Sequence, residues 1–202
     1  MKIFGHPMST CTRKVLMTLA ETNTPYELVV VDFAKNEHKQ APHLARQPFG
    51  QVPAIQDGDF ELYESRAICR YINDKVNGPL VPRDVRDRAR MEQWISIETS
   101  NFTGPVMKFV FKHIFQREQP PGAIEAATEQ LSTALGIMDK QLAGNPFIAG
   151  STFTLADICF MPYLEYGMAT PAKDVITKHA HVAAWWNKIS EKPAWRKIAG
   201  RA

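Results

Sequence analysis

The sequence predicts two regions of different structural class, a mixed α/β region followed by an all-helical region. Segments rich in β-branched residues, which are typical of strands, occur only in the first part of the chain. The rest of the chain repeats apolar residues at helical spacing. Between them lies GPLVPRD at 78–84, whose two prolines and glycine favour a stiff connection. We therefore expect domains over 1–78 and 86–202, joined by a linker over 79–85.

The first region is expected to follow the order β-α-β-(short helix)-β-β-α. The strand KIFG opens it, and helical spacing over 13–23 predicts the first helix. The β-branched run over 27–33 is typical of a buried strand. Two alternating segments then flank Asp57-Gly58, which predicts a two-residue hairpin because both turn positions favour positive φ. Helical spacing returns over 65–76.

After the linker the sequence shows no convincing strand, and apolar residues recur at helical spacing in several segments. A short helix is expected after Pro193. The longer predicted helices span residues 86–102, 106–117, 123–142, 154–167 and 177–191.

Composition and charge narrow the function classes. The 202 residues are 45% hydrophobic with a net charge of +3, as expected of a soluble globular protein. Basic residues are interleaved with acidic ones, which argues against a nucleic-acid binder. No apolar run reaches the ~20 residues of a membrane span, and no signal peptide is visible. The three cysteines and six histidines lack metal-ligand spacing, so we expect no metal site and a location in the reducing cytoplasm.

The segment FGHPMSTCTRKVL places Ser9, Thr10 and Cys11 where the first helix is expected to begin. Serine and threonine cap helix N-termini by accepting hydrogen bonds from free amides. The same amides, together with the helix dipole, stabilise an anion. Ser9 could therefore act only as a cap, or it could also hold a thiolate, which is the reactive form of a thiol.

Two further segments are suited to an extended peptide ligand. Val52-Pro53 precedes a strand, where a cis bond would expose the Val52 backbone to a peptide; a strand-edge turn is the alternative. Glu64-Ser65 begins a helix and is either a cap or a site for an amino-acid head group. In the second case Ser65 and the free amides hold the carboxylate, and Glu64 accepts from the ammonium.

A fourth segment, KNEHKQAP, places His38 and Lys39 after the second predicted strand. These residues either form a solvated loop or pair with another carboxylate through charge-assisted hydrogen bonds. The four segments together describe one ligand, a small extended peptide with a thiol, two carboxylates and an α-ammonium. That ligand is glutathione.

The same residues resemble a known family. GHPMSTCTRKV and the nearly continuous segment from NEHKQAP to SRAICRYI are similar to cytosolic glutathione S-transferases, most closely the serine-using phi class. The resemblance covers essentially the whole chain. It implies the glutathione transferase fold, a thioredoxin-like N-terminal domain followed by an all-helical domain, in a homodimer. It also implies an enzyme that conjugates the thiolate of glutathione, its cosubstrate, to small hydrophobic electrophiles in detoxification.

The resemblance assigns roles to single residues. Ser9 matches the serine that activates the thiol of glutathione. The other matching positions bind glutathione: His38 and Lys39 at the glycyl carboxylate, Gln51, Val52 and cis Pro53 at the backbone, Glu64 and Ser65 at the γ-glutamyl group, and Arg66 as nearby positive charge.

The electrophile site should be apolar and lie between the two halves. The candidates for the electrophile site, each of which is alternatively a core residue, are Met8, Thr10, Phe33, Phe109, Phe111, Phe115, Tyr163 and Tyr166.

Phe49 lies in the loop before Pro53. Its side chain either inserts into a second subunit of the expected homodimer or packs over Pro48.

Cys11 leaves a rival activity open. Related classes use a cysteine near this position, so Cys11 facing the ligand would predict a glutathione-dependent thiol reductase or peroxidase. We favour the alternative, in which Cys11 packs against the helix as a small apolar residue. A second alternative is a non-catalytic protein that binds apolar ligands. The combination of Ser9, Val52-Pro53 and Glu64-Ser65 argues against it, because a pure scaffold has no physical need for all three.

The segment FTLADI in the helical half has the spacing of a capping box. Thr154 would cap the amide of Asp157, and Asp157 would accept from the amide of Thr154. The same box resembles one found across glutathione transferases. Its expected role is structural, and Asp157→Ala is expected to cost roughly 1–2 kcal/mol of stability.

Overall fold

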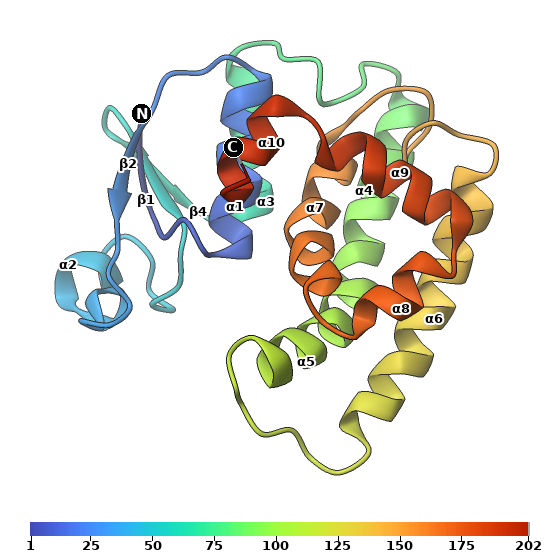
Figure 1. The fold of residues 1–202 in the computed structure, drawn as a ribbon. Helices are drawn as coiled ribbons and strands as arrows, with labels where there is room; N and C mark the ends of the chain where they lie inside the picture. The colour runs from blue at the N-terminus through green and yellow to red at the C-terminus, as the bar shows by residue number, and fades with distance from the viewer. Residues whose placement is uncertain (202) are drawn as a thin grey trace. The chain divides into compact units, whose positions relative to one another are not determined.

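The computed structural model describes residues 1–201 (Figure 1). The chain divides into two compact units. One unit contains Met1–Val81 and the residues from Arg196 onward, and the other contains Pro82–Trp195. This boundary falls inside the last helix, α10 (Pro193–Ala199), which the sequence-based division assigns entirely to the second domain.

The first unit is built on a mixed four-stranded sheet. The strands are β1 (Lys2–Gly5), β2 (Glu27–Val30), β3 (Ala54–Asp57) and β4 (Phe60–Tyr63). Their order is β2-β1-β3-β4, with β1 parallel to β2 and antiparallel to β3, and β3 antiparallel to β4. Ile3 of β1 lies opposite both Leu28 and Ile55 and is fully buried, so β1 forms the centre of this core.

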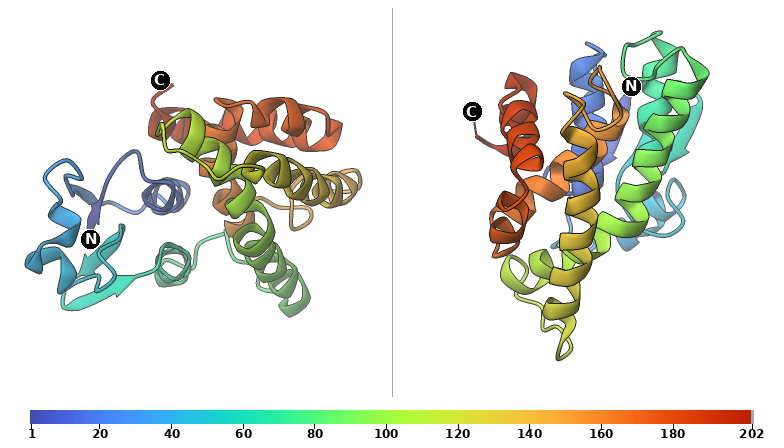
Figure 2. Two further views of the ribbon diagram at one scale, coloured as in Figure 1. Left: turned by 90° about the horizontal axis from the view of Figure 1, so that it is seen from below. Right: turned by 90° about the vertical axis from the view of Figure 1, so that its right-hand side faces the viewer.

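Helices cover both faces of this sheet. They are α1 (Thr10–Glu21), α2 (Ala41–Leu44) and α3 (Ser65–Lys75), with a short 3₁₀ turn, η1 (Glu37–Lys39), before α2. α1 and α3 lie side by side on one face, and α2 lies on the other (Figures 1 and 2). Val15 and Leu19 of α1, and Ile68 and Ile72 of α3, are fully buried. The predicted α/β class and element order are confirmed.

The second strand is shorter than the predicted 27–33. After Val30 the side chain of Asp32 organises a turn, because its Oδ1 accepts hydrogen bonds from the amides of Ala34 (2.8 Å) and Lys35 (3.3 Å). The amide of Asp32 in turn donates to Glu37 Oε2 at 2.8 Å. These side-chain bonds take the backbone amides that a longer strand would use.

The hairpin between β3 and β4 is present, but its loop lies one residue later than predicted. Asp57 still pairs with Phe60, so Gly58 and Asp59 form the loop. Gly58 has φ of +67°, whereas Asp59 is not in the left-handed region. A turn with glycine first in the loop requires only one positive φ, and this explains the shift.

Asp57 anchors the hairpin to α3. It accepts a hydrogen bond from Tyr71 Oη at 2.7 Å and pairs with Lys75. These hydrogen bonds, first that of Lys75 and then that of Tyr71, lower the pKa of Asp57 below its ordinary value of 3.8. The folded state therefore favours the charged carboxylate, and the resulting stability is present above that ordinary value and is lost as the pH falls through the lowered pKa.

We expect Asp57→Asn to lower the free energy of unfolding near neutral pH by about 1 kcal/mol or less, since the pair is partly exposed. The difference from the wild type should shrink in acid, and urea unfolding at several pH values measures it. Asp59→Asn, an equal charge change at an exposed neighbour, is the control. A difference that does not shrink as the pH falls below the ordinary value of 3.8 would contradict the assignment.

The second unit is helical, as predicted. It contains α4 (Val85–Ile97), a π-helical turn η2 (Glu98–Phe102), α5 (Thr103–His113), α6 (Ala123–Leu142), α7 (Leu155–Met168), α8 (Ala172–Thr177) and α9 (Ala180–Ser190). α7 is central: it contacts α4, α5, α8 and α9, and all its residues except Glu165 and Met168 are buried. α6 runs beside α5 (Figure 2).

Several helix boundaries differ from the prediction, and one of them is the end of α5, at His113 rather than at residue 117. The expected break near Pro105 is absent, because the π turn η2 leads directly into α5; Pro105 lacks an amide proton, and a wider turn accommodates the missing bond. The short helix α8 was not predicted. α9 begins at Ala180, where Asp139 Oδ1 of α6 accepts from the amides of His181 (2.8 Å) and Val182 (3.1 Å).

Residues 1–201 contain no helix long and apolar enough to cross a membrane. In the same part of the chain, no group of three or more His, Cys, Asp or Glu side chains is arranged to hold a metal ion. Cys11, Cys69 and Cys159 are all free thiols.

Candidate active site

The strand register brings the four predicted segments to one end of the sheet. Ala54 at the start of β3 lies opposite Phe4 near the end of β1 and opposite Tyr63 at the end of β4. Gly5 lies opposite Val30 at the end of β2. The segments that follow β1, β2 and β4, and the one that precedes β3, therefore leave the sheet at the same end. They carry Ser9, His38-Lys39, Glu64-Ser65 and Val52-Pro53.

Ser9 is the N-cap of α1. Its backbone is extended (φ −74°, ψ 127°), and its Oγ accepts a hydrogen bond from the amide of Thr12 at 3.2 Å. Capping uses a lone pair of the oxygen and leaves the hydroxyl proton available to donate. The amides of Thr10 and Cys11, at the start of the helix, have no acceptor within α1. The half-buried Ser9 can therefore cap the helix and donate to an anion at the same time.

Two buried side chains that the sequence analysis missed hold the backbone of Gln51. Gln47 Oε1 accepts from the amide of Gln51 at 3.0 Å, and His43 Nε2 lies 2.6 Å from its carbonyl oxygen. His43 and Gln47 are 5% and 2% exposed. The Val52-Pro53 bond that follows is cis. The sequence signal available for His43 was a polar residue between apolar neighbours in α2. That signal does not identify its partner, Gln51, which lies eight residues later in the chain.

His38 and Lys39 lie on η1, next to the loop that precedes Pro53. Lys39 Nζ donates to the carbonyl oxygen of Phe49 at 3.0 Å. Gly50, at φ +62°, lies so close that a Cβ there would be 2.8 Å from the carbonyl oxygen of His38. The Nδ1 atom of His38 is buried and has no hydrogen-bond partner within the described chain. Both residues therefore lie against the Phe49-Gly50 segment, which directly precedes Gln51 in the chain.

Glu64 and Ser65 begin α3. Glu64 is its N-cap residue, but the side chain makes no capping hydrogen bond and the backbone has φ of +73°. A positive φ is unusual for a residue with a Cβ and is held in place only by its surroundings. Glu64 is exposed, Ser65 is buried and Arg66 is half-buried. The first amides of α3 thus remain open beside a carboxylate and a hydroxyl.

The position of Cys11 supports the packed interpretation. Its side chain is half-buried, and it lies seven residues, or two helical turns, before Thr18, which hydrogen-bonds the fully buried thiol of Cys69 in α3. Cys11 therefore lies on the side of α1 that faces α3. Burial raises the pKa of Cys69 to about 11, which makes that thiol unreactive at neutral pH.

The candidates for the electrophile site fall in both units. In the first unit Met8 and Phe33 are exposed and Thr10 is half-buried. In the second unit Phe109 and Tyr163 are 3% and 4% exposed, which favours a packing role for both. The other three form an aromatic group, with ring centroids 6.2 Å apart for Phe111 and Phe115 and 6.5 Å apart for Phe115 and Tyr166.

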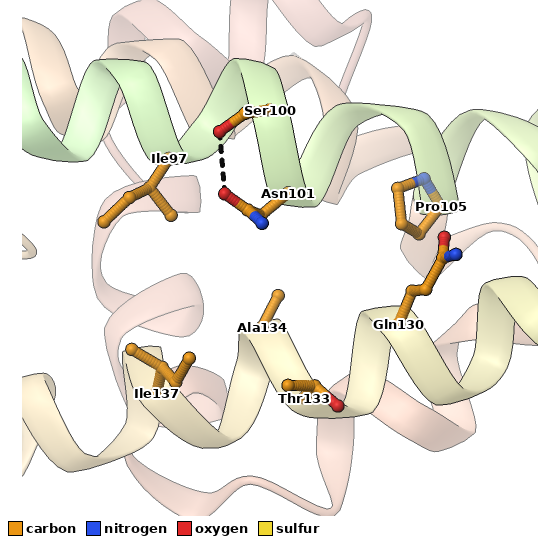
Figure 3. Close-up of a pocket in the computed structure, with 8 residues that line it drawn as sticks. All are labelled: Ile97, Ser100, Asn101, Pro105, Gln130, Thr133, Ala134 and Ile137. Atoms are coloured by element: carbon orange, nitrogen blue, oxygen red, sulfur yellow. Dashed lines mark hydrogen bonds between the residues drawn. The ribbon is translucent and has the colours of Figure 1, made fainter.

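A separate groove of about 470 Å³ lies in the second unit between α6 and the α4–α5 segment (Figure 3). Ile137 and Ala134 of α6 face Ile97 and Asn101 across it (Figure 3). The groove is lined by Ile97, Ser100, Asn101, Pro105, Gln130, Thr133, Ala134 and Ile137. None of these lining side chains is titratable, so the groove provides no acid–base group.

Comparison with known families gives two matches. The family model described as "Glutathione S-transferase, N-terminal domain" matches residues 1–74. The model described as "Glutathione S-transferase, C-terminal domain" matches residues 102–193. The first match contains all four segments at the end of the sheet, including Ser9, and the second contains most of the helical unit.

Individual proteins are similar over nearly the full chain. Glutathione S-transferase F9 of Arabidopsis thaliana is 34% identical, covering 100% of this chain and 97% of its own. Glutathione S-transferase PARB of Nicotiana tabacum is 38% identical over 97% and 95%. The crystal structure of glutathione transferase F7 from Populus trichocarpa has a TM-score of 0.93 at 37% identity, covering 99% and 98%. Glutathione S-transferase I from maize, in complex with an atrazine–glutathione conjugate, has a TM-score of 0.90 at 32% identity over 99% and 96%.

Proposed function

The chain belongs to the glutathione S-transferase family, and from this premise we propose how its own residues catalyse the reaction. It is a transferase that uses glutathione as cosubstrate. Structures of similar proteins hold lactoylglutathione and an atrazine–glutathione conjugate. The predictions of the family, the fold and the enzyme class are confirmed.

The observation that carries the proposed mechanism is the position of Ser9 at the N-terminus of α1. Its hydroxyl donates to the sulfur of glutathione, and the open amides and dipole of α1 add positive potential. Both effects favour the thiolate over the thiol and lower the pKa of the bound sulfur. The thiolate then attacks the electrophilic carbon, forms the C–S bond and displaces the leaving group, while the thiol proton passes to solvent.

The remaining segments hold glutathione in an extended pose. Val52 presents backbone groups that pair with the cysteinyl part of the peptide, as an added strand would. Gln51, whose own backbone is held by Gln47 and His43, contacts the peptide through its side chain. Glu64 and Ser65 bind the γ-glutamyl ammonium and carboxylate, with Arg66 nearby. His38 and Lys39 bind the glycyl carboxylate through charge-assisted hydrogen bonds. Among the electrophile candidates, Met8, Thr10 and Phe33 belong to the same unit as Ser9, and we propose these three as contacts of the electrophile.

The test of this function compares the wild type with Cys11→Ala, using glutathione and a chloro-nitro-aromatic electrophile at neutral pH. We expect turnover by the wild type and a rate within about twofold of it for Cys11→Ala, because Cys11 faces α3. Loss of activity in Cys11→Ala would support the rival thiol reductase or peroxidase. Tight binding of apolar ligands without any turnover would support the non-catalytic alternative.

We further propose that the protein is a homodimer. Two exposed apolar side chains, Phe49 (67%) and Ile137 (55%), the latter on the rim of the groove in Figure 3, are suited to contact a second copy. Sedimentation equilibrium at micromolar concentration should return twice the mass of one chain, and the mass of a single chain would overturn the proposal.

We propose a cytoplasmic location. It is supported by the three free thiols, which are compatible with a reducing compartment.

A further inference from the structure

The loop between β1 and α1 is organised around His6, a residue with no assigned role. The amide of His6 donates to Thr12 Oγ1 at 3.3 Å, and its carbonyl oxygen accepts from the amide of Ser9 at 2.8 Å. Its ring Nδ1 accepts from the amide of Met8 at 3.2 Å. His6 therefore contacts the cap residue itself, the residue before it and a residue of the first helical turn. The path of the chain into Ser9 depends on these three bonds.

The bond to Met8 specifies the form of the imidazole. An Nδ1 atom that accepts a hydrogen bond carries no proton, so the ring proton of the neutral form lies on Nε2. A side chain that accepts from the amide two residues ahead closes the same kind of turn that asparagine and aspartate form. At this position histidine thus supplies a turn acceptor together with a flat ring.

The flat ring makes a second connection. The ring of His6 stacks on Phe33 with centroids 4.8 Å apart and an interplanar angle of 19°. Phe33 in turn meets His38 edge to face, with centroids 5.0 Å apart at 82°. Phe33 is 40% exposed, so these two histidines supply ring contacts to a side chain that solvent reaches from the other side.

We infer that His6 is a positioning residue that acts on both ends of the glutathione site, on Ser9 through the Met8 hydrogen bond and on His38 through Phe33. The inference rests on the proposed function, because it takes Ser9 as the group at the sulfur and His38 as a group at the glycyl carboxylate. The two actions use different parts of the side chain. The hydrogen bond requires an acceptor near the backbone, whereas the contact with Phe33 requires a ring.

Three substitutions separate these actions. His6→Asn keeps an acceptor for the amide of Met8 and removes the ring. His6→Phe keeps a ring over Phe33 and removes the acceptor. His6→Ala removes both. His181→Asn, at an exposed histidine of α9, is the matched control for a histidine-to-asparagine change outside the site.

We expect His6→Asn to raise the KM for glutathione by about 3–10-fold with kcat nearly unchanged, because His38 loses its support. His6→Phe should lower kcat by about 10-fold with KM nearly unchanged, because Ser9 is displaced. His6→Ala should show both effects, and His181→Asn neither. Thermal unfolding of each variant shows that the kinetic changes belong to folded protein.

Wild-type kinetics in all His6 variants would overturn the inference. So would the same pattern of kcat and KM in His6→Asn and His6→Phe, since the two actions would then not be separable. Ser9→Ala measured in the same assay distinguishes a failure of the proposed serine mechanism from a failure of the role inferred for His6. If Ser9→Ala keeps wild-type turnover, the serine mechanism fails whatever the His6 variants do. If Ser9→Ala loses turnover while the His6 variants do not, only the role of His6 is wrong.

Discussion

Ser9→Ala is expected to lower kcat/KM for conjugation of glutathione to a chloro-nitro-aromatic electrophile by ~10²-fold or more at neutral pH. The substitution removes the hydroxyl that donates to the thiolate, so the pKa of the bound thiol rises and less of it is ionised. The lost rate should therefore return partly at higher pH, where the bound thiol ionises without the serine. A profile of kcat/KM against pH measures this shift.

The capping role of Ser9 must be separated from its catalytic role. Its Oγ accepts from the amide of Thr12, and loss of such a cap costs about 1 kcal/mol of stability with alanine but only a few tenths with glycine. Ser9→Gly should thus unfold nearly as the wild type does and still lose conjugation as severely as Ser9→Ala. Ser9→Thr keeps a hydroxyl and should retain part of the rate. A wild-type rate in Ser9→Ala would rule out the serine mechanism.

Asp157→Ala is expected to cause the largest loss of stability, roughly 3–5 kcal/mol rather than the 1–2 kcal/mol expected from the sequence. The capping box is present as predicted, but Asp157 does more than cap α7. Its Oδ2 accepts from the amide (2.8 Å) and hydroxyl (3.2 Å) of Thr154, and its Oδ1 accepts from the amide of Ile148 (3.0 Å) and the indole of Trp185 (2.9 Å). The side chain is fully buried, so alanine leaves these donors without an acceptor and without water.

Thr154→Ala is the matched comparison for this prediction. It removes a capping hydroxyl that accepts from the amide of Ala156, and it should cost about 1 kcal/mol. Burial raises the pKa of Asp157 and the four hydrogen bonds oppose that shift, so its carboxylate depends on all of its donors. Chemical unfolding of both variants tests the difference. Equal losses in Asp157→Ala and Thr154→Ala would show that Asp157 is only a cap.

Local sequence signals determined the features whose physical causes lie close together in the chain. α6 spans the predicted residues Ala123–Leu142, because a long run of helix formers follows Gly122 and needs no distant partner. The capping box of α7 is complete within four residues. Ser9 at the start of α1 and Glu64-Ser65 at the start of α3 were identified because helix N-termini carry a recognisable residue pattern.

The four segments proposed to bind glutathione were also readable from the sequence, since each is a short motif with its own chemistry. The sequence did not reveal which side chains hold these segments in place. His43 and Gln47 hold Gln51 through contacts that depend on how α2 turns toward the loop before β3. The orientation of Cys11 toward α3 depends on which face of α1 the rest of the unit covers.

Tertiary structure also decided the remaining helix boundaries and side-chain partners, because these depend on residues far apart in the chain. α9 begins where Asp139, some forty residues earlier in the chain, accepts hydrogen bonds from the first amides of the helix. No sequence pattern near Ala180 therefore marks the start of α9. The stacking of His6 on Phe33, and of Phe33 against His38, joins segments that only the parallel pairing of β1 and β2 brings together. Hydrogen bonds and ring contacts act over a few ångströms in space, whereas sequence patterns report only on neighbours in the chain; where the two coincide, the sequence sufficed, and elsewhere the fold was required.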